Sequence, residues 1–117
     1  MILEYPAGQK TPYLLFDGDK GTLKIEGRCI PEFAQLFFED LNKLIDDYSS
    51  PLSVSINLEF FNTATAKELV TLFNKFKKFP TTVNWLYEKD DEDMIGAGND
   101  FAEIFKDIKF TYTEIER

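Results

Sequence analysis

The sequence predicts one α/β domain in which helices pack on a mixed sheet, and two patterns lead to this prediction. Segments 12–16 and 22–27 have strand-like character and are joined by the turn Gly18-Asp-Lys-Gly21, which is typical of a β-hairpin. From residue 31 onward, helical and strand-like segments alternate, which favours parallel strands connected by helical crossovers. The expected order is therefore ββαβαβαβ.

The first helix is expected to begin at Pro31, because proline suits the first turn of a helix, and to end at Ser49-Ser-Pro51. Apolar residues recur there at helical spacing and should form the face that packs on the sheet. They are Phe33, Leu36, Phe37, Leu41, Leu44, Ile45 and Tyr48.

The next two elements are a strand and a second helix. Segment 52–60 alternates and then becomes apolar, which is consistent with a central strand covered on both faces. The helix follows directly and closes at Pro80. Its expected inward residues are Ala66, Leu69, Val70, Phe73 and Phe76.

The last part of the chain predicts a strand, a third helix and a final strand. Segment 82–88 is strand-like, and the acidic run 90–93 resembles the first turn of a helix, where carboxylates are favourable. This helix should carry Phe101, Ile104 and Phe105. Segment 109–114 is the last expected strand.

Composition and charge narrow the range of functions. The chain has 117 residues, enough for one domain, residues 1–117, with a buried core. Its net charge of −8 repels nucleic acid and anionic membrane surfaces. The first residues carry neither a basic region nor a long apolar stretch, so we expect no membrane insertion and a cytoplasmic location.

Cysteine and histidine usage excludes several kinds of site. Cys29 is the single cysteine and histidine is absent, which removes disulfides, Cys/His zinc sites and imidazole bases. Chemistry based on carboxylates remains open. The acidic run 90–93 does not complete an EF-hand, because Ile95 and Ala102 occupy positions that need oxygen ligands. We therefore expect no metal ion or cofactor.

A hydroxyl-rich turn joins the central strand to the second helix and is the main candidate site. Phosphate on Thr63 would lie at a helix N-terminus, where free N–H groups and the helix dipole favour an anion. The same residues also fit helix capping: Asn62 can serve as the N-cap, and Thr65-Ala-Lys-Glu68 matches a capping box. Sequence chemistry alone leaves both readings open.

A competing enzymatic reading comes from Asp17 and Asp19. A strand ending in Asp-x-Asp resembles haloacid-dehalogenase phosphatases, in which the two carboxylates serve as nucleophile and general acid. Thr22 falls one position late for that pattern, and a hairpin strand follows where a helix is needed. A small Asp-dependent metal phosphatase is the alternative to a binding protein, and a solvated hairpin turn is favoured over it.

Taken together, the motifs resemble the SiaC-type regulatory phosphoproteins of bacteria, which have a STAS-like fold related to that of anti-sigma-factor antagonists. The resemblance extends over most of the chain and is most specific at Phe61-Asn-Thr63. Its other matches are Thr11-Pro12-Tyr13, Gly27-Arg28, Pro31-Glu32, Lys67, Asn84-Trp85, Tyr87, Asp90-Asp91 and Asp100-Phe-Ala-Glu103.

The resemblance implies a non-enzymatic signalling protein that acts by partner switching. It implies that a protein kinase phosphorylates Thr63, with Thr65 as second candidate, and that a PP2C-type phosphatase reverses this. The unmodified protein would bind and activate a target such as a diguanylate cyclase, which makes c-di-GMP. Partner contacts are expected at Asn62, Thr63, Ala64, Thr65 and Lys67. A constitutive scaffold, with Thr63 only as a cap, is the remaining alternative.

Overall fold

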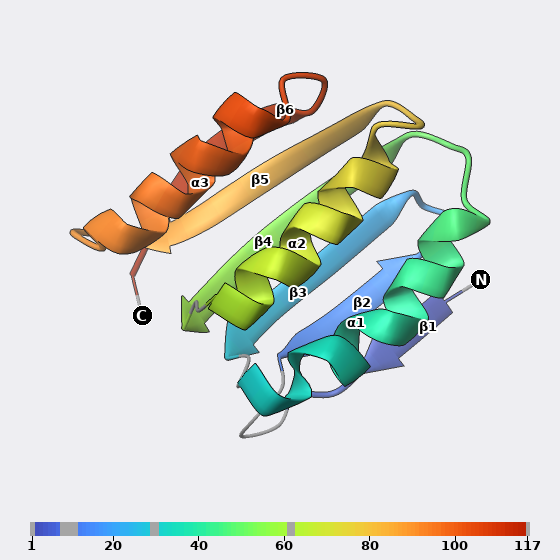
Figure 1. Ribbon diagram of the computed structural model, residues 1–117, viewed down its shortest axis with the longest axis horizontal. Coiled ribbons are helices and arrows are strands. Elements are labelled where there is room, and N and C mark those ends of the chain that lie inside the picture. Colours follow the sequence, from blue (N-terminus) through green and yellow to red (C-terminus); the bar gives the residue numbers. More distant parts are fainter. Residues whose placement is uncertain (1, 8–11, 29–30, 61–62, 117) are drawn as a thin grey trace.

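The fold is a six-stranded sheet with three helices, seen in a computed structural model that describes residues 2–7, 12–28, 31–60 and 63–116, with the backbone alone at 31–37 and 60. Figure 1 gives the arrangement. The strands are β1 (Ile2–Tyr5), β2 (Tyr13–Asp17), β3 (Thr22–Arg28), β4 (Leu52–Phe60), β5 (Thr81–Glu88) and β6 (Lys109–Ile115). The helices are α1 (Pro31–Asp46), α2 (Thr63–Phe76) and α3 (Glu92–Ile104).

The sheet is mixed, and its strands lie side by side in the order of the sequence. β1, β2 and β3 pair antiparallel, whereas β3, β4, β5 and β6 pair parallel through the three helices. The predicted mixed α/β architecture and the hairpin of β2 and β3 are therefore confirmed.

The predicted element order omitted β1, which is an additional strand at the N-terminal end. Leu3 and Tyr5 lie opposite Phe16 and Leu14 in the β1–β2 register and pack against the core. The Tyr5 hydroxyl also donates a hydrogen bond to Asp40 of α1. Four residues that precede Pro6 give only a weak local signal, so β1 depends on long-range pairing.

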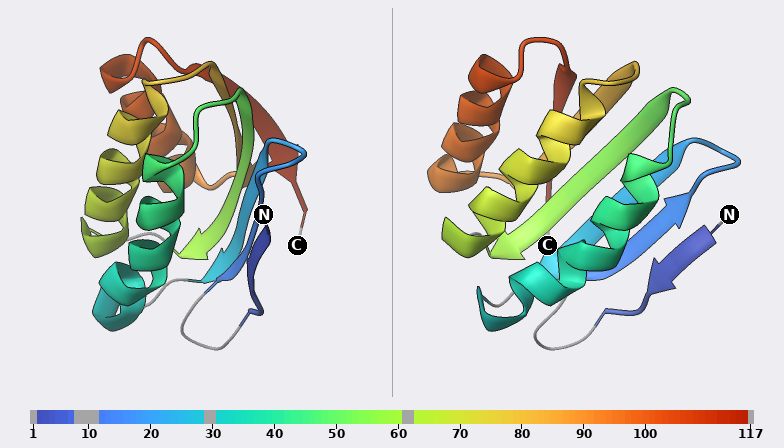
Figure 2. Two further views of the ribbon diagram at one scale, coloured as in Figure 1. Left: turned by 90° about the vertical axis from the view of Figure 1, so that its right-hand side faces the viewer. Right: turned by 45° about the vertical axis from the view of Figure 1, so that its right-hand side comes forward.

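All three helices cover the same face of the sheet, as the left view of Figure 2 shows. Right-handed crossovers that always advance to the next strand place every helix on one side. The expectation that segment 52–60 is covered on both faces is wrong. Val54, Ile56 and Leu58 of β4 are buried, whereas Ser53 and Glu59, which point to the other face, are exposed.

The core between the sheet and the helices is rich in aromatic rings. Phe73 of α2 lies at its centre, and the centroid of its ring is 5.2–5.8 Å from those of four other phenylalanine rings. The indole N–H of Trp85 donates to the Met94 carbonyl at 2.9 Å and so fixes β5 to α3. Phe101 and Phe105 are buried, whereas Ile104 is 64% exposed. The rings around Phe73 are Phe76, Phe101, Phe105 and Phe110.

No helix among the described residues is long and apolar enough to cross a membrane.

Candidate functional site

The candidate site lies at the edge of the sheet where the parallel strands β3, β4 and β5 end and the helices begin. We call this edge the carboxyl edge. The N-termini of α1, α2 and α3 gather there in Figure 1. In open α/β sheets this edge is the usual place for ligands and partners, because free N–H groups and helix dipoles converge on it.

Thr63 is the first residue of α2, and its side chain is exposed. Thr65 stands two residues later and is fully buried, at 0% exposure. Ala64 is half-buried, and Lys67 is exposed one turn into the helix. Asn62 lies outside the described residues. Of the two candidate hydroxyl groups, only that of Thr63 is open to a kinase in the folded protein.

A cation lies next to the end of β4. Arg28 ends β3 and is paired with Phe60, after a register shift between Gly27 and Arg28. Gly27 has a φ of +123°, a conformation that favours glycine, and an added Cβ would lie 3.4 Å from the Pro12 Cα. Arg28 and Lys67 therefore bring positive charge to the carboxyl edge, and neither forms an ion pair within the described part of the chain.

The N-termini of α2 and α3 differ in charge. Asp91 caps α3 by accepting the Met94 N–H at 3.1 Å, and Glu92 and Asp93 add two carboxylates in its first turn. The first turn of α2 carries no acidic residue. An anion added at Thr63 would thus meet a helix dipole that no carboxylate of α2 yet complements.

The aspartates of the competing phosphatase reading lie elsewhere. Asp17 ends β2, which runs antiparallel to β3. It therefore lies where β3 begins, at the end of the strands opposite the carboxyl edge and Thr63. Its Oδ1 accepts the N–H groups of Asp19 at 3.0 Å and Lys20 at 3.2 Å. Asp17 therefore caps a hairpin turn, as an aspartate in such a turn commonly does. Among the described residues, no group of carboxylates is arranged to hold a metal ion.

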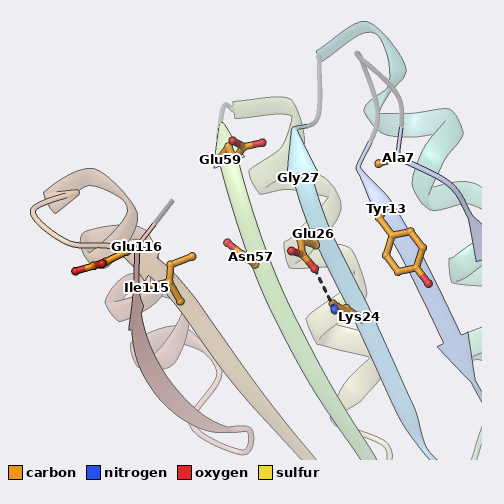
Figure 3. A pocket seen from close by; sticks show the side chains of 9 residues that line it. All are labelled: Ala7, Tyr13, Lys24, Glu26, Gly27, Asn57, Glu59, Ile115 and Glu116. Carbon is orange, nitrogen blue, oxygen red and sulfur yellow. Dashed lines mark ion pairs between the residues drawn. The ribbon is translucent and has the colours of Figure 1, made fainter.

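Sequence reasoning missed a hollow of about 800 Å³ on the sheet face that the helices leave uncovered (Figure 3). The Tyr13 hydroxyl donates to Glu4 at 2.6 Å, which raises the Tyr13 pKa, because the bond favours the neutral phenol. Lys24 and Glu26 form an ion pair at 3.1 Å. The alternation in 22–27 and 52–60 indicates which residues share this face, but the hollow itself depends on the twist of the sheet. Its lining is Ala7, Tyr13, Lys24, Glu26, Gly27, Asn57, Glu59, Ile115 and Glu116.

Comparison with known proteins adds to this geometry. The model of the SiaC family regulatory phosphoproteins matches residues 5–115. The chain belongs to the SiaC family. An uncharacterized protein of Pseudomonas aeruginosa strain UCBPP-PA14 is 23% identical over 110 residues, which cover 86% of this chain and 87% of that protein.

Solved structures from Pseudomonas aeruginosa have the same fold. Apo-SiaC matches with a TM-score of 0.84 at 21% identity, over 97% of this chain and 98% of that one. SiaC in complex with the diguanylate cyclase SiaD, which it activates, matches with a TM-score of 0.79 at 23% identity, over 97% and 99%. The six-stranded sheet is therefore the sheet of the SiaC fold.

Proposed function

We propose that this protein is a non-enzymatic, cytoplasmic regulator whose binding to a protein target is controlled by reversible phosphorylation of Thr63. The observation that carries the proposal is the exposure of Thr63 at the start of α2 in a chain that belongs to a family of regulatory phosphoproteins. The proposal assigns no enzymatic reaction, phosphoester hydrolysis included, to this protein itself.

Burial favours Thr63 over Thr65 as the modified residue. A kinase must bring the attacking hydroxyl to the γ-phosphate of ATP, and Thr65 is fully buried in the folded protein. Phosphorylation of Thr65 would therefore require α2 to leave the sheet. Thr63 needs no such rearrangement.

The phosphate would act by changing the surface while leaving the fold intact. It adds close to two negative charges and three acceptor oxygens at the end of a helix that accommodates an anion. A target that packs on the α2 start, by which we mean Asn62, Thr63, Ala64 and Lys67, would have to desolvate that charge, whereas the buried Thr65 offers it no contact. The modified protein should therefore release its target without unfolding.

The proposed partners are a protein kinase, a PP2C-type phosphatase and a downstream effector. A diguanylate cyclase is the first candidate for the effector, because SiaC of Pseudomonas aeruginosa is the activator of the cyclase SiaD. The exposed Lys67 is placed to contact either the phosphate or the kinase.

The test is quantitative capture of proteins from a lysate of the native host on immobilised variants. Thr63→Ala should retain the target, and Thr63→Asp should bind it at least about tenfold more weakly, since desolvating an unpaired carboxylate costs more than about 1.4 kcal/mol. Thr71→Asp is the matched control, because Thr71 is exposed on the same helix away from its N-terminus. Equal capture by all variants and by stoichiometrically phosphorylated protein would contradict the switch and support a constitutive scaffold.

Catalysis by Asp17 has a separate test. We expect no Mg²⁺-dependent hydrolysis of p-nitrophenyl phosphate, because the Asp17 carboxylate already accepts two backbone N–H groups. Turnover that disappears in Asp17→Asn would restore the phosphatase reading.

A further inference from the structure

The outer edge of β6 is the free edge of the sheet opposite β1. β6 pairs with β5 along Lys109–Ile115, and within the described ranges no strand lies on its other side. A free edge presents a row of unpaired N–H and C=O groups that another strand can bind, so natural proteins usually protect it.

The two edges of this sheet differ in protection. β1 has four residues and is followed directly by Pro6, which cannot donate to a further strand. β6 has seven residues, no proline, and a register with β5 that is continuous from end to end. Its charged residues are Lys109 and Glu114 alone, and the positions between them are aromatic or β-branched. Apart from these two charges, β6 therefore lacks the usual devices that prevent pairing.

The backbone groups that point outward from β6 can be assigned. The Ile115 carbonyl accepts the N–H of Lys89, which directly follows β5, so Ile115 directs its backbone groups toward β5. Backbone groups of successive residues in an extended strand point to opposite sides. Phe110, Tyr112 and Glu114 therefore direct their N–H and C=O groups to the free edge.

The middle of this edge also carries an exposed aromatic side chain. Tyr112 is 41% exposed, and its hydroxyl reaches the Gly98 carbonyl at 3.4 Å. Burial of the remainder of the side chain raises the Tyr112 pKa. A tyrosine that is packed on one side and open on the other is a typical centre for an interface.

We propose that β6 pairs antiparallel with β6 of a second copy of this chain, about a two-fold axis at Tyr112. This register places Phe110 opposite Glu114 and Tyr112 opposite its own copy, so every outward N–H and C=O of these residues has a partner. Each such residue pair exchanges two hydrogen bonds. The proposal joins two sheets into one continuous sheet with a closed, isologous interface.

Side chains are compatible with this register. On the open face Thr111 lies opposite Thr113, and on the helix face the two Tyr112 rings are neighbours; both kinds of cross-strand pair are favourable. Lys109 lies opposite Ile115. No charge lies directly opposite a like charge, which distinguishes this register from an arbitrary pairing of an acidic protein with itself.

Net charge sets the strength and the salt dependence of the dimer. Each copy carries −8, so long-range repulsion opposes association until salt screens it. One strand pair is also smaller than a standard interface, so the dimer is weak. The dimer should therefore become tighter as ionic strength rises, the opposite of an association driven by charge attraction.

This proposal does not depend on the one for Thr63. α2 covers the middle of the sheet, whereas β6 is its outermost strand, so pairing at β6 leaves the α2 start open (Figure 1). A failure of the dimer would leave phosphorylation at Thr63 unaffected, and loss of the Thr63 switch would leave the dimer unaffected.

The test is sedimentation equilibrium of the full chain up to about 1 mM protein, at about 0.05 M and about 0.5 M salt. Glu114→Pro removes one outward N–H and keeps the bonds to β5, so it should weaken the dimer at least about tenfold. Glu114→Gln is the matched control, keeps that N–H and should remain within about twofold. Circular dichroism and thermal unfolding establish that both variants fold.

Amide exchange in the wild-type protein gives a second measurement that needs no variant. The amides of Phe110, Tyr112 and Glu114 should become protected as protein concentration rises, whereas those of Thr111 and Thr113 should be protected throughout. A monomer at every concentration and salt would overturn the proposal. So would a dimer that Glu114→Pro leaves intact, equal weakening by both variants, or unchanged exchange at the three amides.

Discussion

Thr63 and Thr65 lie two residues apart in one helix, yet only Thr63 is exposed. Two residues correspond to about 200° of rotation around a helix, so the two hydroxyls must point to opposite sides. The sequence contained this information: Thr65 precedes Leu69 by four residues and Leu72 by seven, which is the spacing of one buried face. The capping motif explains the hydroxyl groups of these residues but takes no account of that spacing.

A glycine pair in α3 gives a residue-scale prediction about stability. An added Cβ on Gly98 would lie 2.6 Å from Cδ1 of Trp85, and that ring is held by its hydrogen bond to Met94. Gly98→Ala should therefore reduce the free energy of unfolding by about 1–3 kcal/mol. Urea denaturation is the measurement.

Gly96 supplies the matched control for Gly98. An added Cβ at Gly96 meets no atom within 4 Å, so Gly96→Ala should stabilise the helix by about 0.5–1 kcal/mol through backbone entropy. If both variants shift stability in the same direction, packing against Trp85 is not the reason that position 98 requires glycine.

The tyrosine at the end of β1 gives a prediction about pH. The hydrogen bond from Tyr5 to Asp40, followed by burial and the charge of Asp40, raises the Tyr5 pKa in the folded protein. Folding therefore favours the neutral phenol, and this stabilisation is complete below about pH 10 and is lost as pH rises further. Denaturation of wild type and Tyr5→Phe between about pH 8 and about pH 11 should give a stability difference that shrinks at high pH. A difference that stays constant would contradict the assignment.

At the scale of elements, the N-terminus of α2 predicts how the domain tolerates a negative charge. Thr63→Asp should raise stability by about 0.3–1 kcal/mol, because the first turn of α2 contains no carboxylate to complement its dipole. Thr71→Asp, placed in mid-helix, should show no such gain. Added salt should reduce the effect.

The same measurement separates two kinds of switch. A stabilised or unchanged Thr63→Asp protein means that charge alters the surface that a target contacts. A loss of more than about 1 kcal/mol would mean that charge at Thr63 loosens α2, and a switch by local unfolding would then replace the surface mechanism.

The sequence predicts strongly periodic elements well and isolated ones poorly. α2 and the β2–β3 hairpin appear where their spacing and turn residues place them. β1 was missed because Ile2–Tyr5 becomes a strand only when β2 is beside it. The third helix was expected to carry Phe105, but α3 ends at Ile104 and Phe105 is its C-cap.

At the scale of the whole molecule, one ring cluster joins α2, α3 and β6. Phe73 contacts Phe101, Phe105 and Phe110, so Phe73→Ala removes packing from all three elements at once. The expected loss is about 3–5 kcal/mol, a large part of the stability of a domain of this size. Asn74→Ala, exposed at the next position, should change stability by less than about 0.5 kcal/mol.

Trp85 provides the probe for this prediction, because it is the one tryptophan of the chain and is fully buried. Within each protein, whether wild type or Phe73→Ala, Trp85 fluorescence and far-ultraviolet circular dichroism should report the same unfolding midpoint as each other. Separate midpoints would mean that α3 and β6 unfold independently of the rest of the sheet.

The layer arrangement and the hollow illustrate what the sequence could not determine. The apolar end of segment 52–60 suggested two covered faces, but the handedness of successive crossovers places every helix on one side. The hollow on the open face joins residues from β2, β3, β4 and the end of β6, and only the twisted sheet brings them together. Both features arise from topology, which local patterns do not encode.

The most direct test of the central claim is phosphosite mapping by mass spectrometry on the protein isolated from its native host under several growth conditions. We expect phosphate on Thr63, in a fraction that changes with condition. Phosphate on Thr65 alone would contradict the argument from burial, and the absence of phosphate under every condition would contradict the switch itself.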